Sequence, residues 1–209
     1  MGRTPDRNRI RRGYDELAGT YAERQSYGDR ALAVIEGFLD SLGDRARVLD
    51  AGCGHGEPVL RRVGDGTAVV GLDLSREQLR LATRAVPGAR LVQGDMTAFP
   101  FREGAFDAVV AYRSVIHVPI SERPAVFEGF ARVLAPGGRV LLSEAPEGFE
   151  RTTDDWLDSG VEMRWEMAGV ERTREGLHDA GLAVTDEWPA PAPPEDGPEP
   201  SFLAARLDE

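Results

Sequence analysis

A short apolar run that ends in three alternating glycines constrains the fold more than any other feature of the sequence. Residues 46–49 (Ala-Arg-Val-Leu) are followed by glycines at positions 52, 54 and 56. Such a run is typical of a buried parallel strand, and the glycines let the backbone bend sharply and bring its N–H groups close to a ligand. Residues 57–63, with a proline near their start and Gly64 behind them, fit a short helix. The sequence thus predicts a strand, a glycine turn and a helix.

A second apolar run, residues 67–72, ends in the carboxylate of Asp73. At the carboxyl end of a parallel strand, such a side chain can hold a ribose diol by two hydrogen bonds. The dinucleotide fingerprint G-x-G-x-x-G lies at a similar turn and would indicate NAD or FAD, but the spacing here is G-x-G-x-G. A nicotinamide dehydrogenase is therefore the less favoured alternative.

Five segments together resemble the class I S-adenosylmethionine-dependent methyltransferases, in particular those that modify small molecules. The segments follow one another in family order and comprise residues 48–56, 71–75, 93–96, 106–110 and 133–141. Their joint occurrence is more specific than any one of them. The resemblance implies S-adenosyl-L-methionine as cofactor. It also implies an α/β fold: a doubly wound, Rossmann-like sheet of seven strands in the order 3-2-1-4-5-7-6, with strand 7 antiparallel.

By this resemblance, residues 1–209 form a single methyltransferase domain. Residues 1–44 are expected to be N-terminal helices that act as a lid, residues 45–145 the cofactor-binding core, and residues 146–209 a substrate-side insertion followed by C-terminal strands. Within the first part, residues 1–12 are expected to be frayed, because they carry five arginines and almost nothing apolar. The proline-rich residues 189–198 are expected to be an extended loop.

The resemblance also assigns the cofactor-binding residues. Asp73 is expected to hold the ribose hydroxyls, while Asp95 and the backbone of Met96 are expected to hold adenine. Asp50 is expected to support the glycine turn and to attract the methionyl ammonium group. The remaining expected cofactor-binding residues are Gly52, Cys53, Gly54, Leu74, Tyr21 and Tyr112.

Two side chains are candidates for the catalytic step, Tyr14 and His117. Tyr14 and Tyr21 recur at helical spacing, which places both phenols on one face of a helix. Ordinary core packing would explain this pattern, but it resembles the N-terminal helix that lies over the cofactor in the family. His117 follows the fourth expected strand, where a ligand crevice is expected. It is either a loop or cap histidine or, by resemblance, a base that orients or deprotonates the acceptor.

The segment after the core, residues 146–167, is rich in charge and contains Trp156, Met163, Trp165 and Met167. Aromatic and methionine side chains suit a partly apolar acceptor. The alternative is a satellite cluster that covers one end of the sheet.

Charge and composition limit the partners. The net charge of −11 argues against a surface built for nucleic acid or anionic lipid. A single cysteine excludes an intrachain disulfide, and no apolar run is long enough to span a bilayer, so a cytoplasmic protein is expected. We further expect a monomer or homodimer and no bound metal. The expected reaction is in-line methyl transfer to a hydroxyl or amine of a metabolite. A regulatory protein that binds S-adenosylmethionine without turnover is the alternative.

Overall fold

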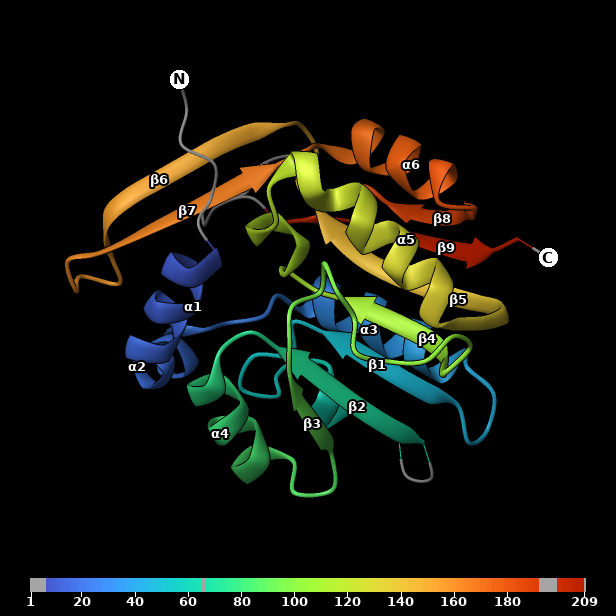
Figure 1. The fold of residues 1–209 in the computed structure, drawn as a ribbon, viewed down its shortest axis with the longest axis horizontal. Coiled ribbons are helices and arrows are strands. Elements are labelled where there is room, and N and C mark those ends of the chain that lie inside the picture. Colours follow the sequence, from blue (N-terminus) through green and yellow to red (C-terminus); the bar gives the residue numbers. More distant parts are fainter. Residues whose placement is uncertain (1–6, 65–66, 192–198, 209) are drawn as a thin grey trace.

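The structure, a computed structural model, describes residues 7–64, 67–191 and 199–208 and is built on one seven-stranded sheet (Figure 1). The strand order is β3-β2-β1-β4-β5-β9-β8. The first five strands pair in parallel, and β9 is antiparallel to both of its neighbours. The bounds are β1 Arg47–Ala51, β2 Ala68–Asp73, β3 Arg90–Gln93, β4 Phe106–Ala111, β5 Leu134–Glu144, β8 Leu182–Trp188 and β9 Ser201–Leu207. This is the order predicted from the sequence, since β8 and β9 are its sixth and seventh strands.

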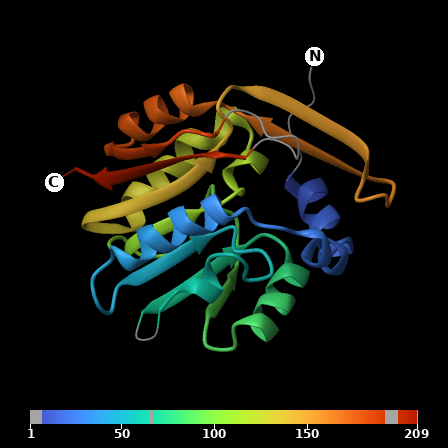
Figure 2. The same cartoon turned by 180° about the vertical axis from the view of Figure 1, so that it is seen from behind.

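Helices cover both faces of the sheet (Figures 1 and 2). On one face lie α3 (Asp29–Asp40) and α4 (Arg76–Ala85), and on the other lie α5 (Arg123–Val133) and α6 (Val170–Asp179). Successive side chains of a strand point to opposite faces, so Val48 packs towards α3 while Leu49 packs towards α5. Both are fully buried, which explains why the strand reads as a continuous apolar run.

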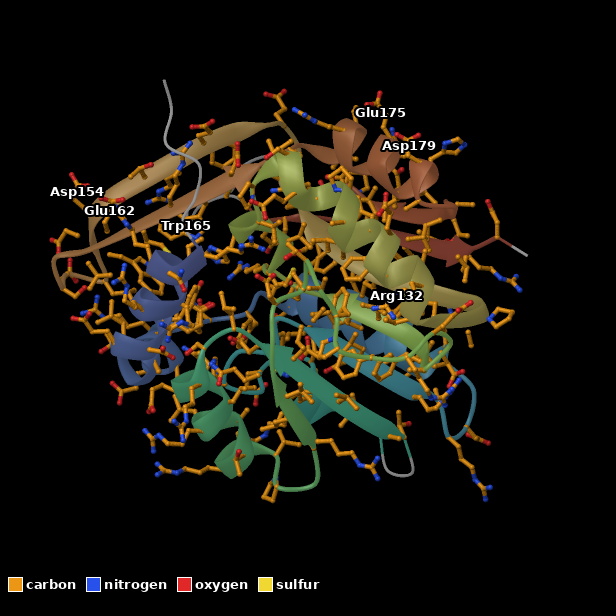
Figure 3. The ribbon with its side chains drawn as sticks, viewed as in Figure 1. Arg132, Asp154, Glu162, Trp165, Glu175 and Asp179 are labelled. Carbon is orange, nitrogen blue, oxygen red and sulfur yellow. The ribbon has the colours of Figure 1, made fainter. Side chains whose placement is uncertain are left out.

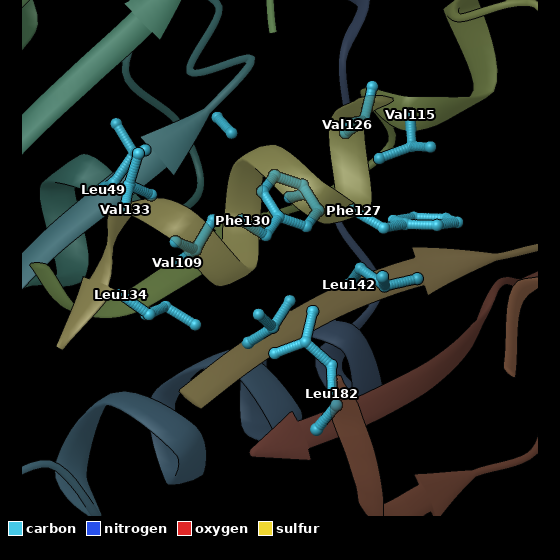
Figure 4. Close-up of a cluster of buried hydrophobic side chains, with 14 of the residues drawn as sticks. Leu49, Val109, Val115, Val126, Phe127, Phe130, Val133, Leu134, Leu142 and Leu182 are labelled. Carbon is cyan, nitrogen blue, oxygen red and sulfur yellow. The ribbon is translucent and has the colours of Figure 1, made fainter. Parts of the chain in front are cut away.

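The largest cluster of buried apolar side chains lies between the sheet and α5 (Figure 4). Phe127 and Phe130 of α5 pack against Val109 of β4 and Leu142 of β5, and all four side chains are buried. Because the central strands are parallel, their carboxyl ends lie together at one end of the sheet. Among the described residues, no helix has the length and apolarity that a membrane crossing requires.

Between β1 and β2 the structure differs from the predicted helix at residues 57–63. Only a single 3₁₀ turn, η1 (Leu60–Arg62), forms there. The reason lies in the packing, because Val59 packs into the cluster under α3 whereas Leu60 packs into the cluster under α4. The segment is therefore shaped by contacts with two separate clusters and not by one apolar stripe.

The expectation of a frayed N-terminus was wrong from Arg7 onwards, while residues 1–6 lie outside the described part. Helices α1 (Arg7–Glu16) and α2 (Ala18–Arg24) lie beside α4, at the carboxyl ends of the parallel strands (Figures 1 and 2). Arg7 pairs with Asp95 at 2.9 Å and with Glu122 at 3.2 Å, and Ile10 is buried. Long-range ion pairs therefore order a segment whose own composition favours fraying.

Residues 146–167, for which no strand was predicted, contain an antiparallel hairpin of β6 (Phe149–Trp156) and β7 (Val161–Met167). The hairpin extends over α1 (Figure 1), and Trp156 and Met163 pack there against Ile10 and Leu17. Strand β5 starts at Leu134 and includes residues 136–138, where its pairing with β4 shifts register. Of the expected proline-rich loop, residues 192–198 lie outside the described part.

Candidate active site

Two adjoining cavities lie where the carboxyl ends of the central strands meet the N-terminal helices. The first has about 890 Å³ of open volume, its mouth included, and is bounded by the glycine turn, Asp73, Asp95 and Tyr112. The second cavity lies under the β6–β7 hairpin. Its walls include Phe149, Trp156, Trp165 and Met167.

The glycine turn is shaped by two different constraints. Gly52 has φ +89°, and a Cβ there would lie 2.3 Å from Cβ of Ser114. Ser114 cannot easily move away, since its hydroxyl donates to the Ala51 carbonyl at 2.6 Å. Gly54 has φ +51°, but a Cβ there would have room, with its nearest neighbour, Oε1 of Gln78, at 3.7 Å. Space requires glycine at position 52, and backbone conformation favours it at position 54.

Asp73 ends β2 with both carboxylate oxygens oriented by backbone groups. One oxygen accepts from the N–H of Gly54 and the other from the N–H of Ser75, each at 2.8 Å. Ser75 caps α4, its hydroxyl accepting from the N–H of Gln78 at 3.1 Å. Burial raises the pKa of Asp73 to about 6, and the two backbone hydrogen bonds oppose that rise. Asp73 and Leu74 both line the first cavity.

Asp95 follows β3 and is held by Thr97 and by Arg7, whose role was not predicted from the sequence. Its Oδ1 accepts from the N–H and the hydroxyl of Thr97, at 2.9 and 2.8 Å, and its Oδ2 accepts from Arg7 at 2.9 Å. Arg7 begins α1, so the first helix is fastened across this end of the cavity. Met96 lines the cavity beside Asp95, and its Cε would lie 3.4 Å from a Cβ at Gly52.

Of the expected cofactor-binding residues, Asp50 does not line the first cavity, and Cys53 lines it although its thiol packs elsewhere. Asp50 is 2% exposed, is not among the described residues that line the cavity, and makes no hydrogen bond to the glycine turn within the described chain. Burial, reinforced by the charge of Asp73, raises the pKa of Asp50 well above its usual range. The thiol of Cys53 packs among Leu60 and Leu79, so the thiol belongs to the core below the turn.

Tyr14 and His117 meet at the boundary between the cavities. The Tyr14 hydroxyl lies 2.8 Å from Nε2 of His117, and the two rings are edge to face with centroids 5.2 Å apart. Burial lowers the pKa of His117 to about 4, and burial raises the pKa of Tyr14 well above its ordinary value. At neutral pH both groups are uncharged, so the phenol can donate to the imidazole.

Five residues line both cavities and therefore form the wall between them. They are Tyr14, Tyr21, Gln25, Arg113 and His117. Arg113 and Gln25 were not singled out from the sequence, although Arg113 directly follows Tyr112, an expected cofactor-binding residue. Tyr112 lies on the first cavity only and stacks on Phe202, with ring centroids 5.8 Å apart and planes 7° apart. The structure thus gathers the two candidate catalytic residues at one junction.

The chain is similar to known methyltransferases in sequence and fold. Residues 48–138 match the family model described as a methyltransferase domain. The chain is 32% identical over 206 residues to the 27-O-demethylrifamycin SV methyltransferase of Amycolatopsis mediterranei, covering 85% of this chain and 75% of that protein. It spans 51% to 75% of the lengths of the first three curated relatives.

Solved structures share the fold. The Burkholderia thailandensis 1,6-didemethyltoxoflavin-N1-methyltransferase, solved with S-adenosylhomocysteine and 1,6-didemethyltoxoflavin bound, has a TM-score of 0.74 at 21% identity, covering 97% of this chain and 88% of that one. The [4+2]-cyclase SpnF has a TM-score of 0.76 at 20% identity, covering 100% of this chain and 98% of that one. With the sheet order, the glycine turn and the sequence relatives taken together, the chain belongs to the class I S-adenosylmethionine-dependent methyltransferases.

Proposed function

We propose that the protein transfers a methyl group, by in-line displacement, from S-adenosylmethionine in the first cavity to a hydroxyl or amine of a small molecule in the second. The observation that carries this proposal is the five-residue wall, because it brings the two cavities together at Tyr14 and His117. Holding two reactants in the right orientation can supply roughly 7–11 kcal/mol of a reaction barrier. Positioning across this wall is therefore the main task of the chain.

The residues of the first cavity suit the cofactor. Each oxygen of Asp73 accepts one backbone hydrogen bond and retains a lone pair, which a ribose hydroxyl can use. Asp95 can accept a hydrogen bond from the adenine amino group while its Oδ2 also accepts from Arg7. When bound, S-adenosylmethionine supplies a methyl group that its sulfonium has already activated. We assign the glycine turn to the methionyl part, with the buried carboxylate of Asp50 beneath it.

Turnover tests the proposal directly. Formation of S-adenosylhomocysteine from S-adenosylmethionine would be followed with a panel of hydroxyl and amine acceptors. Release that depends on both an acceptor and an intact Asp73 supports the proposal. Cofactor binding without acceptor-dependent release from any member of the panel would favour a binding protein instead.

Asp73→Asn is expected to weaken S-adenosylhomocysteine binding by about 1.5–3 kcal/mol, or roughly 10- to 150-fold, because it removes a charged acceptor from the cavity. Asparagine keeps the size of the side chain and one acceptor for the backbone of the turn. Isothermal calorimetry would measure the affinity, with Asp186→Asn, at an exposed position of β8, as the matched control. Equal affinities for wild type and Asp73→Asn would remove Asp73 from the cofactor site.

His117→Gln is expected to change how stability depends on pH. The folded state lowers the pKa of His117 from 6.5 to about 4, so the unfolded state binds the proton more tightly. The imidazole therefore contributes stability that is complete above pH 6.5 and is lost as the pH falls towards 4, by roughly 3 kcal/mol. Asp73 titrates in the same range with the opposite sign, but it does so in both proteins and cancels in the comparison.

Urea unfolding of wild type and His117→Gln between neutral pH and pH 4 would measure this difference. His178→Gln is the matched control, because the His178 side chain is 85% exposed. A constant stability difference between wild type and His117→Gln at every pH would show that the imidazole is not held neutral by burial.

A further inference from the structure

The wall and roof of the second cavity carry two guanidinium groups that lack a carboxylate partner. Arg113 lines both cavities and Arg151, from β6, lines the second. Neither forms an ion pair with any residue of the described chain. Each instead lies over an aromatic ring, Arg113 over Tyr112 at 5.2 Å and Arg151 over Trp165 at 5.6 Å.

The carboxylates that line the second cavity are already neutralised by other arginines. Glu144 pairs with Arg123 at 2.5 Å, and Glu199 lies 3.5 Å from Arg30. A ligand in this cavity therefore meets two uncompensated positive charges and no uncompensated negative charge from its described lining. Because the chain as a whole carries a net charge of −11, this local excess of positive charge runs against the overall balance.

The backbone holds Arg113 in place at the junction. Its φ of +51° is unusual for a residue with a side chain, and its N–H donates to the hydroxyl of Ser143 on β5 at 2.7 Å. The guanidinium acts on the phenols of the wall: burial raises the pKa of Tyr21 to about 12, and Arg113 opposes this rise. Backbone strain of this kind persists where the surrounding structure enforces it, often at a ligand site.

The rest of the second cavity presents flat rings. Trp156 and Trp165 lie edge to face with centroids 6.3 Å apart, and Trp165 lies 6.3 Å from His117. Trp165 is on β7, the strand of the hairpin nearer to α1 (Figures 1 and 3). These rings provide apolar area for a planar molecule whose polar end reaches the wall.

The wall offers little help in removing a proton. His117, with a pKa lowered by burial to about 4, is a weak base, and Tyr14 is held as a neutral phenol. A neutral alcohol would have to lose its proton during transfer, whereas an ionised oxygen would not. The lack of a base in the wall and the unpaired guanidinium groups therefore both favour an acceptor that is already ionised.

We propose that the acceptor is a planar organic anion, held by its ionised oxygen against Arg113 at the junction and by its ring against Trp156 and Trp165. This inference rests on the proposed function and narrows its acceptor to an acidic hydroxyl such as that of a phenol or enol. The oxygen anion forms a bond to the methyl carbon as the carbon–sulfur bond breaks, and the electron pair of that bond remains on sulfur. One cation and one anion become two neutral products, and no proton has to leave.

The test compares two probes of nearly equal shape, 4-nitrophenol and its methyl ether 4-nitroanisole. At mildly alkaline pH the first is an anion and the second is neutral. Calorimetry in saturating S-adenosylhomocysteine should show that the wild type prefers the phenolate by about 10- to 100-fold, the range of one hydrogen bond to a charged group. Arg113→Gln should lose most of this preference and Arg113→Lys should retain most of it, while binding of the ether stays unchanged.

Two controls complete the design. Arg90→Gln, at an exposed position at the start of β3, should keep the full preference for the phenolate. Binding of S-adenosylhomocysteine to each variant should stay within about twofold of the wild type, which also shows that the variant is folded. Equal binding of both probes to the wild type would overturn the inference, as would a loss of S-adenosylhomocysteine binding in folded Arg113→Gln, because Arg113 would then serve the cofactor.

These outcomes also separate the inference from the proposed function. A wild-type protein that fails to bind S-adenosylhomocysteine would overturn both. Acceptor-dependent turnover with no preference for the phenolate would overturn the inference alone.

Discussion

Gly52→Ala is expected to abolish measurable S-adenosylhomocysteine binding and to destabilise the fold by about 2–5 kcal/mol. The added Cβ would lie 2.3 Å from Cβ of Ser114, and overpacking of this kind costs about 1–3 kcal/mol. The φ of +89° adds about 1–2 kcal/mol for a residue with a side chain. Relief of the clash has to move either the turn or the loop after β4, and both line the first cavity.

Two further variants separate the clash from the backbone strain. Gly54→Ala, at a position with room for a Cβ, should cost about 1–2 kcal/mol of stability from its φ and keep most of its cofactor affinity. In the double variant Gly52→Ala/Ser114→Gly the clash is removed but the strain remains, so stability should be partly restored. Thermal unfolding and calorimetry would measure both quantities. Wild-type affinity in Gly52→Ala would show that the turn tolerates the side chain.

Arg123→Met is expected to lower the free energy of unfolding by about 3–5 kcal/mol, because it leaves a buried carboxylate without its partner. The side chains of Arg123 and Glu144 are 3% and 1% exposed and lie 2.5 Å apart. Glu144 also accepts from Thr173 of α6 at 3.1 Å, and Arg123 donates to the carbonyl of Glu166 on β7. One ion pair therefore joins α5, the sheet, the hairpin and α6.

Urea unfolding would test this, together with the double variant Arg123→Met/Glu144→Gln. Removing both charges should recover much of the loss, since most of the cost comes from the unpaired charge rather than from the lost attraction. Arg80→Met is the control, because its pairing with Glu77 on α4 is exposed and should contribute less than about 1 kcal/mol. A loss below 1 kcal/mol for Arg123→Met would show that the fold does not depend on this ion pair.

The sheet and the first cavity could be predicted from local patterns. The apolar run of β1, the glycine turn and Asp73 at the end of β2 are adjacent or nearly adjacent in sequence, and family order supplied the strand order. The same holds for the cap of α4, where Ser75 and Gln78 are three residues apart. Such features depend on short-range spacing, which a single sequence displays.

The missed features depend on contacts between distant residues. Arg7 pairs with Asp95 and Glu122, which lie far along the chain, so its contacts are not visible in the local sequence. Strand β6 carries charged side chains on both faces, so it lacks the alternation that signals a strand. Strand β7 is an exception, because its apolar and charged residues do alternate, and this local signal was overlooked. The role of Arg113 emerges only when the hairpin closes the second cavity above it. For the same reason the steric restriction at Gly52 could not be predicted, because it comes from Ser114, which lies after β4.

Helix α1 is fastened to three separate parts of the molecule by charged side chains. Arg7 reaches Asp95 beyond β3, Arg9 pairs with Glu162 of β7, and Asp15 accepts from Ser75 at the start of α4 at 2.7 Å. The two ion pairs are partly exposed to solvent, so dissolved ions screen them, with a Debye length of about 8 Å at physiological ionic strength and about 3 Å at 1 M. The attachment of α1, which lines the first cavity through Arg7, Ile10 and Tyr14, should therefore weaken as the ionic strength of the surroundings rises.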